Sequence, residues 1–330
     1  MSSALIGAGF LGGLALTLAS SELMARGLTR LGTKAGLSEG LIGLLAALGA
    51  DAPELSSAVV AILAGAGDVG VGVVVGSNLF NLAALLGLSA VVVGGGRVRR
   101  GPLFLDAAAG VGITLAAACL VAGLVPLPAV TVVAFGVALG YALILAAPPA
   151  WRRRVANLFT GTPRDLSEVA YEVSHDMPAA THGSWAPVYL LPVAVAGVVL
   201  GSYVMVHQAL AAAPLLHLSS TALGTVVLAV LTSLPNLWVA LHFARHDRGT
   251  ALFSAAMNSN SINLLGGLIF PAVFVGTSLA RSSAGPFGIL LALTLLAVVA
   301  PMPRGRLSRV AGASIIAPYV LFAGLTLAGP

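Results

Sequence analysis

Long runs of apolar residues, separated by short clusters of Pro, Gly and charged residues, make up most of this chain. Many runs exceed the 18 residues that mark a candidate membrane-spanning helix, and none shows the strict alternation of barrel strands. The pattern therefore predicts an all-α polytopic membrane protein. Its ten predicted spans are residues 3–27, 38–65, 69–94, 102–124, 126–149, 186–210, 217–244, 249–279, 284–302 and 309–328.

The basic residues are distributed asymmetrically between the loops that join these spans. Fifteen of the sixteen Lys and Arg residues fall in the loops after spans 1, 3, 5, 7 and 9, and only Arg281 falls on the other side. By the positive-inside rule these loops are expected to be cytoplasmic and both termini extracytoplasmic. We expect the first span to be retained, since no basic segment precedes it and it continues through Glu22 to Arg26.

Composition supports a membrane protein. Hydrophobic residues make up 58% and charged residues 8% of the chain, whereas soluble domains carry about 25% charged residues. The net charge of +5 is explained by the cytoplasmic loops, so the expected surroundings are the lipid bilayer, in the plasma or inner membrane, and no nucleic acid. A single cysteine, Cys119, excludes an internal disulfide.

The two halves of the chain are related by an ungapped shift of 182 residues. Pro53 then falls on Pro235, and the motif Ser77-Asn78-x-x-Asn81 falls on the same motif starting at Ser259. Because the halves would enter the membrane from opposite sides, the sequence predicts an inverted repeat. The expected organisation is a five-helix repeat at 1–149, a cytoplasmic linker at 150–185 and a second five-helix repeat at 186–330.

Polar side chains inside the predicted membrane core gather in four short segments, within spans 2, 3, 7 and 8. Carboxylates, amides and hydroxyls are hard oxygen ligands of the kind that Ca²⁺ takes. The segments supply Asp51, Pro53 and Glu54; Ser77 and Asn81; Thr232, Ser233, Pro235 and Asn236; and Ser259 and Asn263. Each proline is expected to break its helix and to free a backbone carbonyl four residues earlier, at Gly49 and Leu231.

These segments resemble the two α-repeats of the calcium/cation antiporter superfamily, which includes the sodium/calcium exchangers. That superfamily typically shows Gly-Thr-Ser-x-Pro-Glu in both repeats, each followed by Gly-Ser-Asn-x-x-Asn or a close variant. The α-repeats would be residues 41–88 and 223–270. The resemblance implies a midplane ion site, alternating access and no cofactor. It makes Glu54 the central ligand, and its other implied ligands are the side chains of Ser77, Asn81, Thr232, Ser259 and Asn263 and the carbonyls of Ala47 and Ala229.

The chain departs from the superfamily pattern at two positions. Asn236 stands where the second repeat usually has glutamate, and Ala50-Asp51 stands in place of Thr-Ser. Both core carboxylates therefore come from the first repeat. Asp51 is open to two interpretations: it either caps the helix that starts at Pro53 or replaces the carboxylate missing at position 236.

The polar segments and the resemblance together favour secondary exchange of Ca²⁺ for Na⁺ as the function. Proton coupling is the alternative, because two carboxylates three residues apart in a low dielectric resist simultaneous ionisation. A cation channel, or a cation sensor that transports nothing, is the alternative from a different class. An enzyme is not expected, since neither a paired-His metal motif nor Gly-x-Ser-x-Gly is found.

Several other polar residues lie outside the four segments. Glu22 either faces the cavity or pairs near the membrane surface, and Asp106 is expected to be interfacial at the start of its span. None of the six histidines is expected to bind an ion. Residues 163–173 are expected to form a short helix in the cytoplasmic loop.

Overall fold

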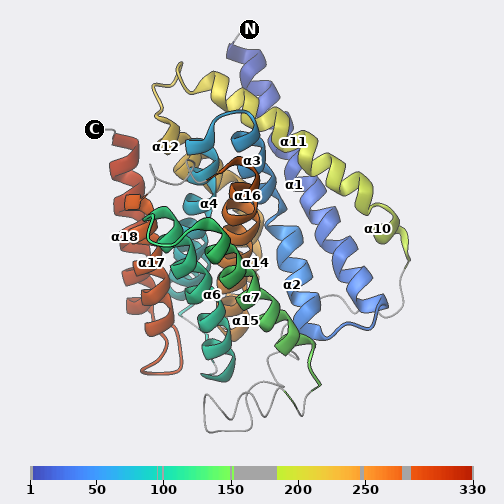
Figure 1. The fold of residues 1–330 in the computed structure, drawn as a ribbon, viewed down its shortest axis with the longest axis vertical. Coiled ribbons are helices and arrows are strands. Elements are labelled where there is room, and N and C mark those ends of the chain that lie inside the picture. The colour runs from blue at the N-terminus through green and yellow to red at the C-terminus, as the bar shows by residue number, and fades with distance from the viewer. Residues whose placement is uncertain are drawn as a thin grey trace.

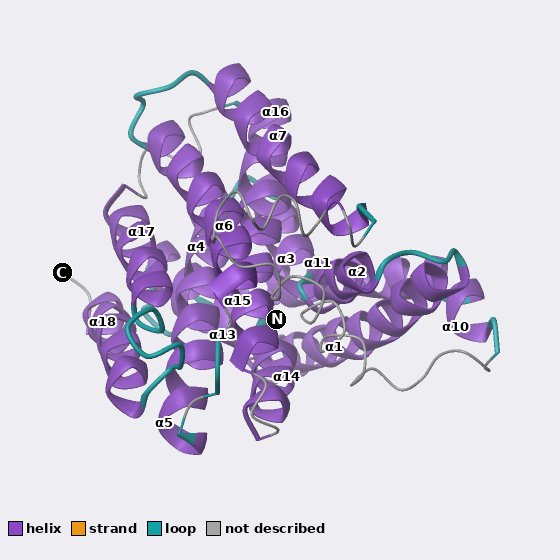
Figure 2. Cartoon of the chain, turned by 90° about the horizontal axis from the view of Figure 1, so that it is seen from below, coloured by secondary structure: helices purple, strands orange, loops and turns teal. Residues whose placement is uncertain are grey.

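The computed structural model describes residues 3–94, 96–98, 100–148, 151, 184–245, 249–276 and 284–328. These residues form helices and no extended strand, as Figures 1 and 2 show. The predicted helix at 163–173, together with Arg281, His175, His182 and His246, lies outside the described residues.

The described residues of the first half form seven α-helices and one π-helical segment, which lengthens the third span. They are α1 (Ser3–Lys34), α2 (Glu39–Ala50), α3 (Ala52–Leu63), α4 (Gly67–Asn81), η1 (Leu82–Leu88), α5 (Ser89–Val93), α6 (Arg100–Val121) and α7 (Leu127–Ala146).

The second half repeats this order with more interruptions. Its elements are α10 (Ala186–Tyr189), α11 (Leu191–Ala212), α12 (Ser220–Ala222), η3 (Leu223–Leu228), α13 (Ala229–Thr232), α14 (Leu234–Arg245), α15 (Gly249–Leu264), η4 (Leu265–Ile269), α16 (Phe270–Val275), α17 (Ala284–Val299) and α18 (Arg309–Ala328).

Among the described residues, seven helices are long and apolar enough to cross a membrane, and nine spans result if each bent pair counts as one. The ninth predicted span corresponds to a shorter apolar helix, Gly285–Val299. The helices therefore fall where the apolar runs predict them, but length and composition support up to nine spans rather than ten.

Two helices are broken at equivalent places. The helix of span 2 bends by 51° between α2 and α3, at Asp51, and that of span 7 bends by 46° between α13 and α14, at Ser233. Each break precedes a proline by two residues, as expected for a residue that cannot continue the hydrogen-bonded ladder. The π-helical segments η1 and η4 likewise follow the two Asn-rich motifs, where such segments often mark functional sites.

The span that runs from α4 through η1 to α5 lies at the centre of the bundle. Of its most apolar window, 94% is buried, against 17% for α7 and for α18. Glycines let this helix approach the second half closely: Gly72 of α4 lies against Gly224 of η3, and a side chain at Gly76 would meet the backbone of Thr225. Small residues at such crossings are typical of packed membrane helices.

Helices α1 and α11 form a long pair along one flank of this bundle (Figures 1 and 2). Their backbones touch where Gly13 faces Gly201: a methyl group added at Gly201 would lie 2.8 Å from the Gly13 carbonyl oxygen. The pair reaches the core mainly through contacts of α1 with α2 and of α11 with α3.

Hydrogen bonds connect the loops predicted to be cytoplasmic with one another and with the helix ends beside them. The Val98 amide donates to the Gly305 carbonyl (2.9 Å), and the Thr250 hydroxyl donates to the Arg97 carbonyl (3.3 Å). The Ser38 hydroxyl donates to the Leu145 carbonyl (2.7 Å). Figure 1 shows these loops towards one end of the molecule and both termini towards the other.

Candidate cation-binding site

The break in span 2 places Asp51 at the end of α2 and the start of α3, fully buried. Its side chain makes no capping hydrogen bond to α3. Instead its Oδ1 atom accepts hydrogen bonds from Asn236 Nδ2 (2.7 Å) and Ser259 Oγ (2.8 Å). The interpretation of Asp51 as a helix cap is therefore wrong, because the carboxylate faces the second half of the chain.

Glu54 lies one turn further along α3 and is 1% exposed. Its Oε1 atom accepts hydrogen bonds from Ser233 Oγ (3.0 Å) and from Asn236 Nδ2 (3.0 Å). A single amide nitrogen thus bridges both carboxylates. These three donors, Ser233, Asn236 and Ser259, all come from the second half of the chain, where Asn236 stands in place of the usual second glutamate.

The Asn residues of the two repeated motifs meet around this pair. Asn81 Nδ2 donates to Ser259 Oγ (2.9 Å), and Asn263 Nδ2 donates to Asn78 Oδ1 (3.2 Å). The same serine therefore connects Asn81 to Asp51. Asn78 belongs to the repeated motif but is not among the residues that the sequence predicts to bind the ion.

Ser77 and Thr232 use their hydroxyl protons inside their own helices. Ser77 Oγ donates to the Val73 carbonyl, and Thr232 Oγ1 donates to the Leu228 carbonyl (2.9 Å). Donation of the proton leaves the oxygen lone pairs available as acceptors. Both side chains are fully buried, so each can offer an oxygen but no proton to a neighbour.

The backbone carbonyls at the breaks behave differently from the expectation. The Gly49 carbonyl, which Pro53 was predicted to free, accepts a hydrogen bond from Ser21 Oγ of α1 (2.8 Å), so it is not left unpaired. The Ala47 carbonyl accepts the Asp51 amide (2.8 Å), and the Ala229 carbonyl accepts the Ser233 amide (3.1 Å). A carbonyl oxygen has two lone pairs, so each of these can still accept a second partner.

Four buried oxygen atoms at this place have no hydrogen-bond partner. They are Asp51 Oδ2, Glu54 Oε2, Asn81 Oδ1 and Asn263 Oδ1. Leaving buried polar atoms unpaired is costly, and an intramembrane carboxylate costs several kcal/mol more, on the order of 3 at a helix centre. All four atoms are acceptors, so what they lack is a positive or proton-donating partner.

The described residues supply no such partner from the protein itself. The ion pair they contain is Glu22–Arg26, away from this site, and they hold no group of three or more His, Cys, Asp and Glu side chains. The arrangement therefore fits a cation that prefers neutral oxygens and carboxylates, such as Ca²⁺ or Na⁺, better than a zinc-type ion.

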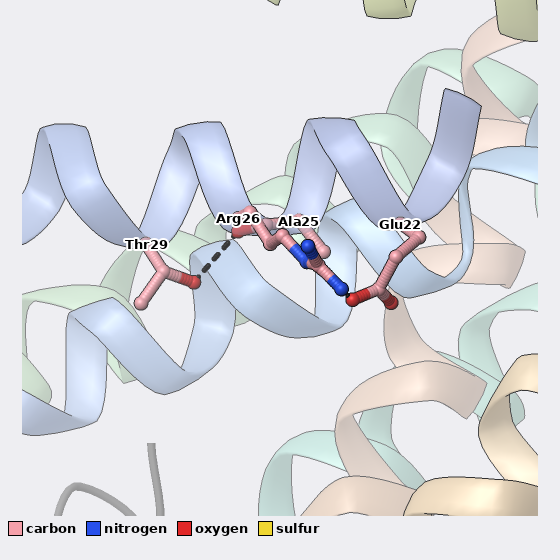
Figure 3. A network of polar contacts seen from close by, with 4 residues as sticks. All are labelled: Glu22, Ala25, Arg26 and Thr29. Atoms are coloured by element: carbon pink, nitrogen blue, oxygen red, sulfur yellow. Dashed lines mark hydrogen bonds and ion pairs between the residues drawn. The ribbon is translucent and has the colours of Figure 1, made fainter. Parts of the chain in front are cut away.

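Glu22 does not take part in this arrangement. Its Oε1 atom lies 2.7 Å from Arg26 Nε, one turn away on the exposed face of α1 (Figure 3). The Glu22 side chain is 61% exposed, so of the two interpretations the structure supports surface pairing. The same figure shows Thr29 donating to the Ala25 carbonyl within α1.

Asp106, which was expected only to lie near the interface at the start of its span, is buried between helices. It lies more than one turn inside α6, is 4% exposed, and accepts hydrogen bonds from Tyr141 and Ser254. Sequence inspection missed these partners because they come from α7 and α15, and no motif links the three positions.

Comparison with known proteins shows which family the chain belongs to. The sequence model described as sodium/calcium exchanger protein matches residues 5–148 and 186–328, which is most of the chain and both halves of it. The chain belongs to the sodium/calcium exchanger protein family.

Individual relatives within and around this family match shorter stretches of sequence. CaxA of Alkalimonas amylolytica is 42% identical over 84 residues, and the exchanger MaX1 of Methanosarcina acetivorans is 27% identical over 140 residues. These matches cover 25% and 41% of this chain, and the chain spans only 26% and 39% of the length of these relatives.

Solved exchanger structures share the fold over nearly the full chain. The sodium-calcium exchanger NCX_Mj superposes with a TM-score of 0.62 at 22% identity, over 98% of this chain and 100% of that one. The H⁺/Ca²⁺ exchanger CAX superposes with a TM-score of 0.70 at 14% identity, over 97% of this chain and 82% of that one. At these identities the likeness establishes the exchanger fold and not the transported ions.

The hydrogen bond from Ser21 to Gly49 generates a stability prediction. Ser21→Ala leaves the buried Gly49 carbonyl without this donor, so we expect a loss of about 1–3 kcal/mol of stability. Ser314→Ala is the matched control, since it removes an exposed hydroxyl that bonds within its own helix. Thermal unfolding of the detergent-solubilised protein measures both, and equal stability of the two variants would contradict a structural role for the Ser21 bond.

Proposed function

We propose that this chain is a secondary-active cation antiporter that exchanges Ca²⁺ for Na⁺. The observation that carries the proposal is that buried oxygens of Asp51, Glu54, Asn81 and Asn263 have no hydrogen-bond partner, while Asn236 bridges the two acids. Membership of the sodium/calcium exchanger protein family supports it, as do the names of MaX1 and NCX_Mj, which are both called sodium/calcium exchangers.

In this proposal the two carboxylates neutralise the ion and neutral oxygens replace its water. Ca²⁺ takes six to eight oxygen ligands, more than two acids can provide. The remaining ligands are proposed to come from the side chains of Ser77, Asn81, Thr232, Ser233, Asn236, Ser259 and Asn263 and from the carbonyls of Ala47 and Ala229. Of these, Glu54, Asn81, Thr232 and Asn263 would form the innermost set.

Asn236 has to change its contact when the ion enters. Its amide N–H groups point at both carboxylates, and a cation in that place would be repelled by them. Turning the amide over presents its oxygen in their place, which converts the donor into a ligand. Binding would therefore replace a bridge between the acids by a bridge through the ion.

The transport cycle we propose is alternating access across ten spans arranged as an inverted repeat. Residues 1–149 and 186–330 would form the repeats and 150–185 the cytoplasmic linker, with both termini extracytoplasmic. The α1–α11 pair would move against the core, because α1 and α11 contact each other more extensively than either contacts any single core helix. Na⁺ and Ca²⁺ would compete for the same oxygens, so one leaves only when the other replaces it.

Proton coupling is the second candidate. Asn236 Nδ2 donates to both Asp51 and Glu54, and no basic residue among the described positions forms an ion pair with either acid. Protons could therefore neutralise the two acids when Ca²⁺ leaves. The fold likeness to CAX, which is an H⁺/Ca²⁺ exchanger, is compatible with this cycle. The two candidates differ only in the driving ion.

Ca²⁺ uptake into proteoliposomes tests the function and the coupling together. We expect uptake driven by internal Na⁺ in the wild type, and a loss of at least tenfold in Glu54→Gln, because a central charged ligand worth more than 1.4 kcal/mol is removed. Uptake driven by a pH gradient alone would favour proton coupling.

The same experiment contains the outcomes that would contradict exchange. Uptake that needs no opposing gradient would indicate a channel, and saturable Ca²⁺ binding without uptake would indicate a sensor. If the Glu54→Gln variant took up Ca²⁺ at the same rate as the wild type, the assignment of the site would be wrong. Glu22→Gln is the matched control, because that carboxylate is exposed and paired with Arg26 outside the site.

A carboxylate swap tests whether Asp51 replaces the acid missing from the second half. Asp51→Ser should lose Ca²⁺ uptake, and adding Asn236→Glu should restore part of it, because the two side chains are in direct contact (2.7 Å) and the carboxylate count returns to two. Double-mutant analysis of initial rates measures the coupling. An Asn236→Glu change that gives no recovery would contradict the replacement.

A further inference from the structure

A second buried carboxylate lies outside the cation-binding site, between α6, α7 and α15. Asp106 Oδ1 accepts a hydrogen bond from the Tyr141 hydroxyl (2.8 Å), and Asp106 Oδ2 accepts one from Ser254 Oγ. All three side chains are at least nine-tenths buried. Because a carboxylate inside a membrane bundle is expensive, it is a functional candidate by default.

The chemistry of this cluster differs from that of the central site. At Asp51 and Glu54 one oxygen of each acid has no partner, whereas both oxygens of Asp106 have hydroxyl donors. Both Asp106 oxygens are already hydrogen-bonded, so neither is left without a partner that an ion would have to supply, and a proton can add to the existing network. We propose that Asp106, Tyr141 and Ser254 form a proton-binding site distinct from the cation-binding site.

The hydroxyl partners suit a group that gains and loses a proton. A hydroxyl is both donor and acceptor, so Ser254 can donate to ionised Asp106 and accept from the protonated acid by rotating its O–H. The network stays hydrogen-bonded in both states. A main-chain N–H in the same place could only donate and would oppose protonation.

The described surroundings hold no fixed charge that would compensate the ionised acid. On the elements packed against α6, namely α7, α15, α17 and η4, the titratable side chain is Tyr141 itself. On α6 the other groups are Arg100, at its start, and Cys119, more than three turns further on. No described side chain on these elements pairs with Asp106 as a cation, so the proposed neutralising group is a proton.

The cluster is separated from the cation-binding site by a short length of α15. Ser254 precedes Ser259 by five residues, which is about 8 Å along a helix. Between them Met257 lies against Gly110 of α6, and beyond it Asn260 donates to Thr114 (2.7 Å). The Met257 contact therefore lies between the two carboxylate clusters along α15.

The position of the site suggests what it controls. Ionised Asp106 ties α6 and α7 to α15, the helix that carries Ser259 and Asn263, through charge-assisted hydrogen bonds. Protonation replaces them by weaker neutral bonds and so loosens that tie. The equivalent position of the second half is Gly288, so the control acts on one half only.

Infrared difference spectroscopy of the purified protein tests proton binding directly. The wild type should show a carbonyl-stretch band of a protonated carboxylic acid that disappears as pH rises, and Asp106→Asn should lose that band. Asp68→Asn, which changes an exposed acid at the start of α4, should keep it. An unchanged set of bands in Asp106→Asn would overturn the proposal.

Two further measurements keep the test decisive. If Asp106→Asn does not fold, Tyr141→Phe removes one donor and should move the pH midpoint of the same band; an unmoved midpoint would overturn the assignment. In proteoliposomes, Asp106→Asn should lose one step of the pH dependence of Ca²⁺ uptake and keep uptake itself. Only the transport measurement rests on the proposed function. If the infrared band behaves as expected but no Ca²⁺ uptake is found, the proposed function fails while the proton-binding site stands.

Discussion

Two carboxylates buried in one broken membrane helix are the constraint on which the rest of the site depends. Asp51 and Glu54 are at most 1% exposed, and no basic side chain among the described residues pairs with either. The protein compensates partly, with hydrogen bonds from Ser233, Asn236 and Ser259. One oxygen of each acid stays unpaired, so the hydrogen bonds alone leave the site without a positive charge to balance the two carboxylates.

The architecture around this pair follows from the need to bring oxygens from both halves to one place. Breaks at Asp51 and Ser233 turn two helices so that side chains near their new starts point at each other. Glycine contacts between α4 and η3 allow the backbones of the two halves to approach within van der Waals distance. Ser21 adds a link from α1 to the first break, so the flanking pair contacts the site as well as the core.

The sequence predicted much of this structure because membrane helices are encoded locally. Apolar runs end at Pro, Gly and charged clusters, so the helices lie close to the predicted ranges, although α1 continues to Lys34 and α17 is shorter than a full span. The four polar segments were recognisable from repeated motifs. Their meeting in space could be expected only from the resemblance between the halves and to a known superfamily.

Long-range partners explain what sequence inspection could not decide. Asp51 has the local pattern of a helix cap, and only the position of Asn236, 185 residues away, shows where its carboxylate points. Asp106 has the local pattern of an interfacial residue, and its burial depends on Tyr141 and Ser254 from two other helices. Glu22 pairs with Arg26, which lies one turn away on the same helix, so for this residue the local sequence was enough to predict pairing as one of two interpretations.

The central claim is that a cation supplies the charge missing between Asp51 and Glu54. Equilibrium Ca²⁺ binding, measured as the rise in unfolding temperature of the purified protein over a Ca²⁺ titration, tests it most directly. A ligand at 100 times its Kd stabilises the native state by about 2.7 kcal/mol, so the wild type should show a clear, saturable rise. Glu54→Gln and Asp51→Asn should show little or none. A Ca²⁺-dependent rise in both variants equal to that of the wild type would contradict the account.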